Sequence, residues 1–464
     1  MDVANNIYKQ RSKANGVTWF VQFVIMLLIT YSLISESAIM MTIAAIFTLL
    51  YVCVTNDSNN MLLLMSISIF ENAFKINGIL VWIFIVLIML GKHMIMSRKI
   101  KNVNNHHVIC LIILLGIECV MDMLNTGING ETLAGILLVL LFFLLFTSQF
   151  QIDIEAKRIV LHFGTAYICA MIFLLKQYGG LQAFMTRFAS LSQGAIDYYR
   201  FGHSYGETVG GAMAIPIYSL LILSISLYDL SCKKRKYTLI ESGYMIIINI
   251  FAFVFGALTV SRSFYLGLIV IVAMFLFSKT GSDKRLANRK RILILCLTVV
   301  AVIFINKFQE YILQVINNLF VRVVLDQSGG TGERSTIWFA ALSYLVNHPI
   351  TLLFGGGATG YVLIGQKASE LFSAGMHNLY LDIVMSWGII GTVCVSVIFR
   401  GMLSAKKMLY ILKKNTIAGI PFVVLAVFAL TAMRTNSMKT YIYFYITMML
   451  MQKWYKSNLE VTDK

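Results

Sequence analysis

The feature that most constrains this chain is a series of apolar segments, each long enough to cross a lipid bilayer as a helix. A bilayer core requires about 20 apolar residues of α-helix, and about 17 are tolerated. Thirteen segments meet or approach the required length: 17–34, 38–54, 79–96, 108–124, 133–150, 159–175, 208–228, 243–260, 264–278, 292–306, 378–399, 416–433 and 441–451. A fourteenth segment, 61–74, is interrupted by Glu71. The sequence therefore predicts an all-α polytopic membrane protein.

Composition agrees with this class and excludes others. Hydrophobic residues make up 58% of the 464 residues and charged residues only 13%, about half of what a soluble domain carries. A disordered chain, a coiled coil and a secreted disulfide scaffold are excluded, because none could solvate so much apolar surface. Six of the seven cysteines lie in apolar segments, so they predict neither a disulfide framework nor a metal cage. We interpret segment 17–34 as a retained span and not as a signal peptide.

The distribution of basic residues predicts the orientation. Short loops rich in Lys and Arg stay cytoplasmic, which places the N-terminus (Lys9, Arg11, Lys13) and the loop with Arg98 and Lys99 inside. An even number of crossings must separate them, so segment 61–74 is predicted to cross. With about 14 transmembrane helices both ends are cytoplasmic, and only 11 of the 38 basic residues lie outside. The net charge of +17 thus reflects membrane orientation, and no nucleic-acid partner is expected.

Two predicted outer loops are unusually long, at residues 176–207 and 307–377. Loops of that length in a compact fold are usually functional. The sequence shows no internal repeat and no soluble domain, so residues 1–464 are predicted to form a single integral membrane domain. We therefore expect the chemistry on the extracytoplasmic side, where no nucleotide-sugar is available.

Outer arginines are the first candidates for binding an anion. The guanidinium group offers a planar fork of donors that matches phosphate oxygens, which lysine cannot do. Arg262 lies in the short turn Ser261-Arg262-Ser263 between two apolar segments, where a charge is costly unless it is paired or faces a polar cavity. The alternative for an outer arginine is that it extends to lipid headgroups, and we favour that alternative for three of them: Arg187, Arg322 and Arg434.

The large outer loop holds a second group of candidates. It contains Arg334, then an apolar stretch of helical period at 339–346, and then the run Gly355-Gly356-Gly357. That run formally matches a dinucleotide-binding pattern, but no strand–helix–strand unit surrounds it. We interpret it as a flexible turn. The alternative is that the backbone approaches a sugar or a phosphate closely.

Histidines and carboxylates complete the set. A histidine can accept a proton near neutral pH, and His377 ends the large loop with Asp382 about one turn further on to orient it. A capping or interfacial role is the alternative. A metal site formed by the three outer histidines lacks any diagnostic spacing, so no metal is expected. Glu118 and Asp122 form an i, i+4 pair inside one span, which we interpret as a buried pair partnered by an outer arginine, in preference to a proton or cation path.

Taken in order, these motifs resemble the signature of the bacterial O-antigen polymerase and O-antigen ligase superfamily. The resemblance covers residues 198–400. It rests on an arginine at the end of the first loop (Arg200), on a span-ending Ser-Arg element (Arg262), and on these residues in and after the large loop: Gly332, Glu333, Arg334, Trp338, His348, Pro349, Leu353, Phe354, Gly355, Gly356, Gly357, Met376, His377, Asn378, Tyr380, Leu381, Gly388 and Gly391.

The resemblance implies a metal-independent, inverting glycosyltransferase without a cofactor, similar to the lipid-dependent membrane transferases of the GT-C type. Donor and acceptor would be undecaprenyl-diphosphate-linked oligosaccharides at the outer face of the bacterial cytoplasmic membrane. By this resemblance Arg200 and Arg262 would clamp the diphosphate, and Arg334 would position diphosphate or sugar. His377 would be the catalytic base or would hold the acceptor hydroxyl.

Within this superfamily we expect a polymerase of O-antigen, capsule or exopolysaccharide repeat units, because an Ile-, Lys- and Asn-rich composition is typical of sources in which such polymerases are common. A ligase or related oligosaccharide transferase is the first alternative, and a polysaccharide flippase or transporter is the second. Transporters usually show repeated halves, which this sequence lacks. Membrane lipids, a chain-length regulator and a separate flippase are the expected partners.

Overall fold

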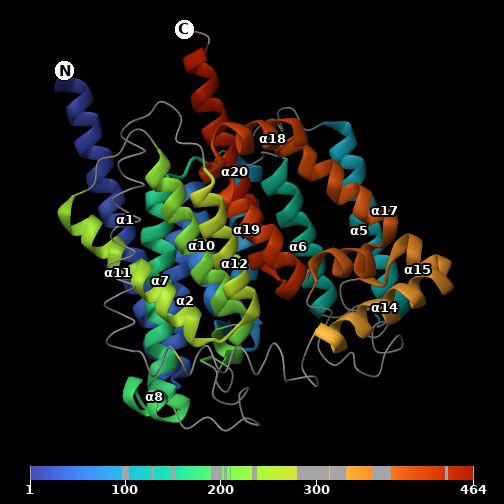
Figure 1. Ribbon diagram of the computed structural model, residues 1–464, viewed down its shortest axis with the longest axis horizontal. Coiled ribbons are helices and arrows are strands. Elements are labelled where there is room, and N and C mark those ends of the chain that lie inside the picture. Colours follow the sequence, from blue (N-terminus) through green and yellow to red (C-terminus); the bar gives the residue numbers. More distant parts are fainter. Residues whose placement is uncertain are drawn as a thin grey trace.

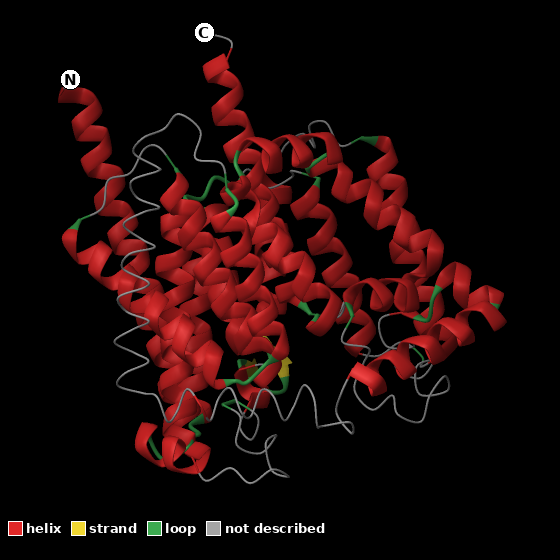
Figure 2. Cartoon of the chain, viewed as in Figure 1, coloured by secondary structure: helices red, strands yellow, loops and turns green. Residues whose placement is uncertain are grey.

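The computed structural model of this chain is almost entirely helical (Figures 1 and 2). The residues that the structure describes are 2–96, 104–125, 127, 130–147, 152–189, 201–202, 206–209, 211–232, 238–278, 313, 331–357, 378–433 and 437–462. The predicted span 292–306 lies outside them. Within the described part, the only strands form one short hairpin. The all-α prediction is therefore confirmed.

Most of the helices follow the predicted apolar segments closely, and three short ones correspond to no predicted segment. Their bounds are α1 Asp2–Ile34, α2 Ala38–Val54, α3 Asp57–Ile67, α4 Val81–Met96, α5 Asn105–Asn125, α6 Gly130–Phe146, α7 Ala156–Gln177, α8 Leu181–Ala189, α10 Gly211–Ser231, α11 Leu239–Leu258, α12 Arg262–Leu276, α14 Thr331–Asn347, α15 Pro349–Phe354, α17 Leu379–Met402, α18 Ala405–Lys414, α19 Thr416–Ala432 and α20 Met438–Thr462. Two 3₁₀ turns, η1 (Ser68–Phe70) and η2 (Gly206–Val209), complete the helical elements.

Six of the described helices are long and apolar enough to cross a membrane: 16–34 of α1, 105–125 of α5, 156–177 of α7, 213–231 of α10, 239–258 of α11 and 379–402 of α17. Further apolar helices, among them α2, α12 and the apolar part of α19, are shorter. The protein is thus a multi-pass membrane protein. The total of about 14 spans stays a prediction, as does the likeness to the GT-C transferases.

Segment 61–74, the doubtful one, forms a helix enclosed by the others. The side chains of α3 from Asn59 onward are buried, because α3 packs against α7, α4, α1 and α20. The helix tightens into η1 and ends at Glu71. A hairpin follows, in which β1 (Lys75–Ile76) pairs with β2 (Ile79–Leu80) across Asn77-Gly78. Asn-Gly is the pair that such a tight turn favours, since both residues here have positive φ, 48° and 82°.

Small residues let the central helices approach one another closely. A side chain at Gly267 of α12 would overlap Leu220 of α10, and one at Gly164 of α7 would overlap Ile248 of α11. Such small-residue contacts are the usual means of helix association in a bilayer. In contrast, large apolar side chains of α1, α2 and α11 are exposed, among them Phe20, Phe47 and Ile246. An apolar outer surface is what a helix bundle presents to lipid.

The two chain ends lie at the same end of the bundle (Figure 1). The short helix α18 lies across that end, whereas α8 lies at the opposite end. Helices α14 and α15 lie beside α17, away from the chain ends. This arrangement gathers the described parts of both long predicted loops away from the chain termini.

Candidate functional site

Arg262 is the first residue of α12, directly after a tight turn from α11. The Thr259 hydroxyl donates to the carbonyl of Gly256 at 2.6 Å, and Ser261 lies at the helix N-cap position. Val260, between them, has φ = 48°. A β-branched residue in the left-handed region is a genuine outlier, and such strain concentrates at functional sites. The fold thus holds Arg262 at a helix N-terminus, where the helix dipole favours a bound anion.

The turn is braced from both helices. Gly256 of α11 leaves room for the ring of Phe264, since a Cβ there would overlap that ring. The Tyr265 hydroxyl donates back to the carbonyl of Ala257 at 3.0 Å. These contacts fix the direction in which α12 begins, and therefore the position of the Arg262 backbone.

The segment that follows Arg200 is attached to this same turn. The backbone N–H of Phe201 donates to the carbonyl of Leu258, the last residue of α11, at 3.2 Å. The Phe201 ring is fully buried among aromatic rings, 5.6 Å from Tyr178 and 4.9 Å from Phe255 between centroids. Gly202 donates its N–H to the Tyr178 hydroxyl at 3.0 Å. Arg200 itself lies outside the described residues. Phe201, which follows it, is hydrogen-bonded to Leu258, four residues before Arg262.

The described part of the large loop is helical. α14 begins at Thr331, earlier than the predicted stretch 339–346, and Arg334 lies in its first turn; nothing is described of that side chain. The buried face of α14, with Ala341 and Leu345, packs on Met385 of α17. The loop is therefore joined to the bundle through α17, and Arg334 stays a predicted site residue.

The glycine run Gly355-Gly356-Gly357 permits a close approach, but to other parts of the chain. Gly356 donates its N–H to the carbonyl of Met385 at 2.8 Å and accepts from the Asn125 amide at 3.1 Å. A Cβ at Gly355 would overlap the backbone at Ser386. The interpretation as a flexible turn is not supported, because these contacts hold the run against α5 and α17.

α17 is broken where this run meets it. Gly388 has φ = 64° and ψ = −169° inside the helix, a conformation open essentially only to glycine. A Cβ at Gly388 would overlap the carbonyl group of Leu353, the second-to-last residue of α15. The glycines on both sides thus let two backbones touch, and this joins α15 to the interrupted helix.

Three carboxylates of α5 and α17 are buried, and two of them, Glu118 and Asp122, lie beside this joint. Glu118, Asp122 and Asp382 have no exposed surface, and the indole Nε1 of Trp387 donates to Glu118 at 2.8 Å. A Cβ at Gly357 would overlap the Asp122 carboxylate, so the glycine run lies against it. Burial of the pair is confirmed. An arginine partner for the pair, and a role of Asp382 in orienting His377, stay predictions.

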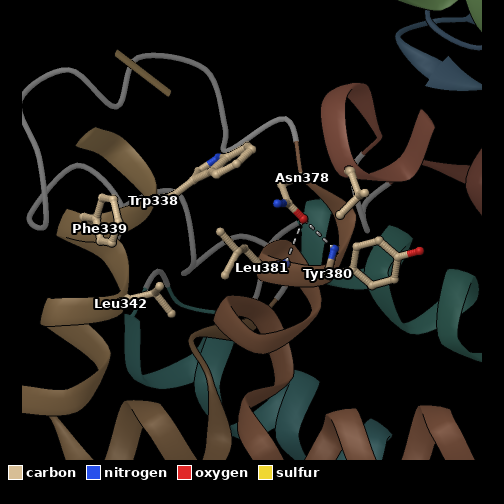
Figure 3. Close-up of a pocket in the computed structure, with 7 residues that line it drawn as sticks. Trp338, Phe339, Leu342, Asn378, Tyr380 and Leu381 are labelled. Atoms are coloured by element: carbon tan, nitrogen blue, oxygen red, sulfur yellow. Dashed lines mark hydrogen bonds between the residues drawn. The ribbon is translucent and has the colours of Figure 1, made fainter. Parts of the chain in front are cut away.

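An apolar pocket of about 300 Å³ opens beside Asn378, which follows the large loop in the sequence (Figure 3). Its floor includes Asn378, whose Oδ1 caps α17 by accepting from the backbone N–H groups of Tyr380 and Leu381 at 3.1 and 3.3 Å. The other lining side chains, contributed by α14, α17 and α19, are Trp338, Phe339, Leu342, Tyr380, Leu381 and Leu430. His377 precedes Asn378 directly but lies outside the described residues.

Of the three outer histidines, only His348 is described. Its ring stacks on Tyr344 at 3.9 Å between centroids, and its Nδ1 lies 2.8 Å from the carbonyl of the same residue. The imidazole is exposed at the N-cap position of α15. His348 therefore has a local structural role, and His203 and His377 are not described.

Sequence reasoning missed a buried ion pair between α20 and the turn after η1. Lys439 lies 3.3 Å from Glu71, and the two side chains are only 15% and 7% exposed. Glu71 also accepts from the Ser437 hydroxyl and from the Met438 backbone N–H at 2.9 and 2.8 Å. Lys439 donates to the Tyr218 hydroxyl at 3.2 Å. Glu71 within an apolar segment was the signal, but nothing in the sequence connected it to a residue 368 positions later.

A search among curated proteins found no match to this chain. A family model described as O-antigen ligase matches residues 247–396. The match begins within α11, includes the Arg262 turn, α12, α14 and α15, and ends within α17. Residues 247–396 are thus similar to the O-antigen ligase family, which is consistent with a member of the O-antigen polymerase and ligase superfamily.

Proposed function

We propose that this protein polymerises undecaprenyl-diphosphate-linked oligosaccharide units into a surface polysaccharide at the outer face of the cytoplasmic membrane. One observation supports the proposal most directly: the residue after Arg200 is hydrogen-bonded to the end of α11, beside the turn that carries Arg262. Phe201, the residue that follows Arg200 in the sequence, thereby lies beside the turn that carries Arg262. A diphosphate is the ligand that a pair of guanidinium forks suits best.

The departure of the leaving group needs little assistance from a general acid. The diphosphate is a good leaving group, so the main requirement is to stabilise the negative charge that develops as the bond to the sugar breaks. Arg262 and Arg200 supply donors for that charge, and the N-terminus of α12 adds its dipole. Arg334 contributes from α14 to positioning the diphosphate or the sugar.

The acceptor hydroxyl is a poor nucleophile, so it needs a base. His377 takes its proton while the oxygen forms a bond to the anomeric carbon of the donor chain. The bond from that carbon to the diphosphate oxygen breaks, undecaprenyl diphosphate leaves, and the configuration inverts. A positioned base contributes about 10²–10⁴ in rate.

The lipid part of the substrate needs an apolar surface close to this chemistry. The pocket beside Asn378 offers one, because its lining is contributed mainly by apolar and aromatic side chains and includes Asn378, the residue that follows the predicted base in the sequence (Figure 3). We propose that the first isoprene units of a lipid-linked substrate occupy it.

A ligase is the second candidate, favoured by the description of the matching family model. The two differ in the acceptor: a polymerase joins one lipid-linked chain to another, whereas a ligase transfers the chain to a lipid A core. Purified protein given only lipid-linked repeat units should lengthen them if it is a polymerase. Transfer that requires an added lipid A core would assign the ligase function.

The test of the transferase proposal is His377→Ala, with the exposed His348→Ala as the matched control. We expect His377→Ala to lower the rate by about 10²–10⁴ and to leave single lipid-linked units at the outer leaflet, where a sugar-specific reagent added from outside detects them. His348→Ala should keep normal chains. Units confined to the inner leaflet would instead indicate a flippase, and normal chains in His377→Ala would remove His377 from the mechanism.

A further inference from the structure

The loop 400–415 between α17 and α19 contains a helix, α18, at the same end of the bundle as the chain termini (Figure 1). This stretch has five basic residues and no acidic one. The helix is fixed at both ends. The Ser404 hydroxyl accepts from the Lys407 N–H at 3.4 Å, and Asn415, which ends α18, caps α19 by accepting from Ile417 and Ala418. α18 therefore has a defined orientation on the bundle.

The two faces of α18 differ sharply. On the inner face Ile411 is fully buried, and Leu412 lies against Gly419 of α19. On the outer face Lys406, Leu409 and Lys413 follow one another at spacings of three and four residues, which places them in one stripe. All three are exposed, as is Lys414. Lysines flanking an apolar side chain on a helix across the end of a membrane bundle are typical of an interfacial helix.

The helix dipole does not account for this stripe. Lys413 and Lys414 are in the last turn, where a positive charge is favourable, but Lys406 is in the first turn, where it is unfavourable. Its neighbour Lys407 has a partner inside the protein, since its ammonium lies 5.7 Å from the centre of the Tyr455 ring. The position of Lys406 therefore indicates that its charge is balanced by an anion from outside the protein.

We propose that the stripe Lys406, Leu409 and Lys413, together with Lys414, binds the headgroups of anionic phospholipids in the cytoplasmic leaflet. Leu409, 56% exposed, extends among the acyl chains. Lys406 and Lys413 lie about 10 Å apart along the axis, so they contact separate headgroups. The proposal concerns the membrane surface at the end with the chain termini, and it is independent of the proposed polymerase site.

The test uses full-length protein in mixed micelles titrated with phosphatidylglycerol, with phosphatidylcholine as the neutral probe. The readout is the lipid concentration that gives half of the maximal rise in unfolding temperature. We expect phosphatidylglycerol to act at far lower concentration, and less well at high salt because the charges are exposed. Each lysine near an anionic surface contributes about fivefold, so K406Q/K413Q/K414Q should need roughly a hundredfold more phosphatidylglycerol.

Two matched variants separate headgroup binding from loss of structure or of net charge. K406R/K413R/K414R keeps the charges and should keep the wild-type preference. K456Q removes an exposed lysine of α20, outside the stripe, and should change the concentration less than twofold. Equal responses of the wild type to the two lipids, or an unchanged preference in the triple glutamine variant, would overturn the proposal. Binding of polyglutamate by the stripe with no lipid preference would assign it to an acidic protein and also overturn it.

Discussion

At the scale of single residues, the turn before Arg262 is the most informative part of the molecule. The sequence predicted Arg262 as a site residue, because a charge between two apolar segments requires a reason. It did not predict that Val260 adopts a left-handed conformation or that Phe201 bonds to Leu258. The local sequence shows where a charge is energetically unfavourable. The contact that brings a second segment to this turn comes from Phe201, over 50 residues earlier in the chain.

The predicted role of Arg262 depends on the geometry of its guanidinium group. Arg262→Lys keeps the positive charge but loses the planar fork, so we expect severe loss of polymer while protein in the membrane stays near the normal level. The measurement is polysaccharide length on a gel together with immunodetection of the protein in membranes. Arg187→Lys, in α8, is the control and should polymerise normally. Free substitution by lysine at both Arg200 and Arg262 would remove the diphosphate role.

At the scale of elements, periodicity and length predicted most helices within a few residues, since apolar length dominates in a bilayer. Other features could not be predicted from the sequence, because they depend on contacts between distant elements. The break of α17 at Gly388 arises from the α15 backbone beside it. The hairpin 75–80 was missed although Asn77-Gly78 is a strong local signal for a tight turn.

The joint between α15 and α17 gives a prediction on stability. Gly388→Ala forces a side chain into a glycine-only conformation and against the Leu353 carbonyl, so the protein should lose at least about 1–3 kcal/mol. The measurement is thermal unfolding of the purified protein. Gly116→Ala is the control, because a Cβ at Gly116 in α5 meets open space and alanine favours a helix by about 0.5–1 kcal/mol. Similar unfolding temperatures for the two variants would contradict the proposed role of the joint.

The buried pair of Glu71 and Lys439 ties the end of η1 to the start of α20, and this gives a second stability prediction. Glu71→Ala leaves the ammonium group of Lys439 without its carboxylate, and breaking such a pair costs about 3–5 kcal/mol. Glu71→Gln combined with Lys439→Met removes both charges and should recover most of the loss, as measured by unfolding temperature. No difference between the single and the double variant would show that the pair contributes little.

At the scale of the whole molecule, charge asymmetry makes the topology testable. The predicted orientation places residues 307–377 outside and the α18 region inside. A reporter that is active only outside the cytoplasm should therefore be active when it is fused after Lys367 and inactive when it is fused after Ser404. Equal activity of the two fusions would overturn the predicted topology. The predicted number of spans rests on the same requirement for an even number of crossings between two cytoplasmic segments, so it would be wrong as well.

The buried carboxylates of α5 also bear on how the chain is made. Trp387, which donates to Glu118, is synthesised 269 residues after it, and Gly356 arrives 231 residues after Asn125. Until then α5 must enter the bilayer without the Trp387 donor to Glu118, and an acidic residue costs up to about 2.5–3.5 kcal/mol when it lies at the centre of an inserting helix. We expect α5 to stay beside the translocon or its neighbours until the last third of the chain has emerged. Truncation before α17 should therefore lower the insertion of a segment more than two hundred residues upstream.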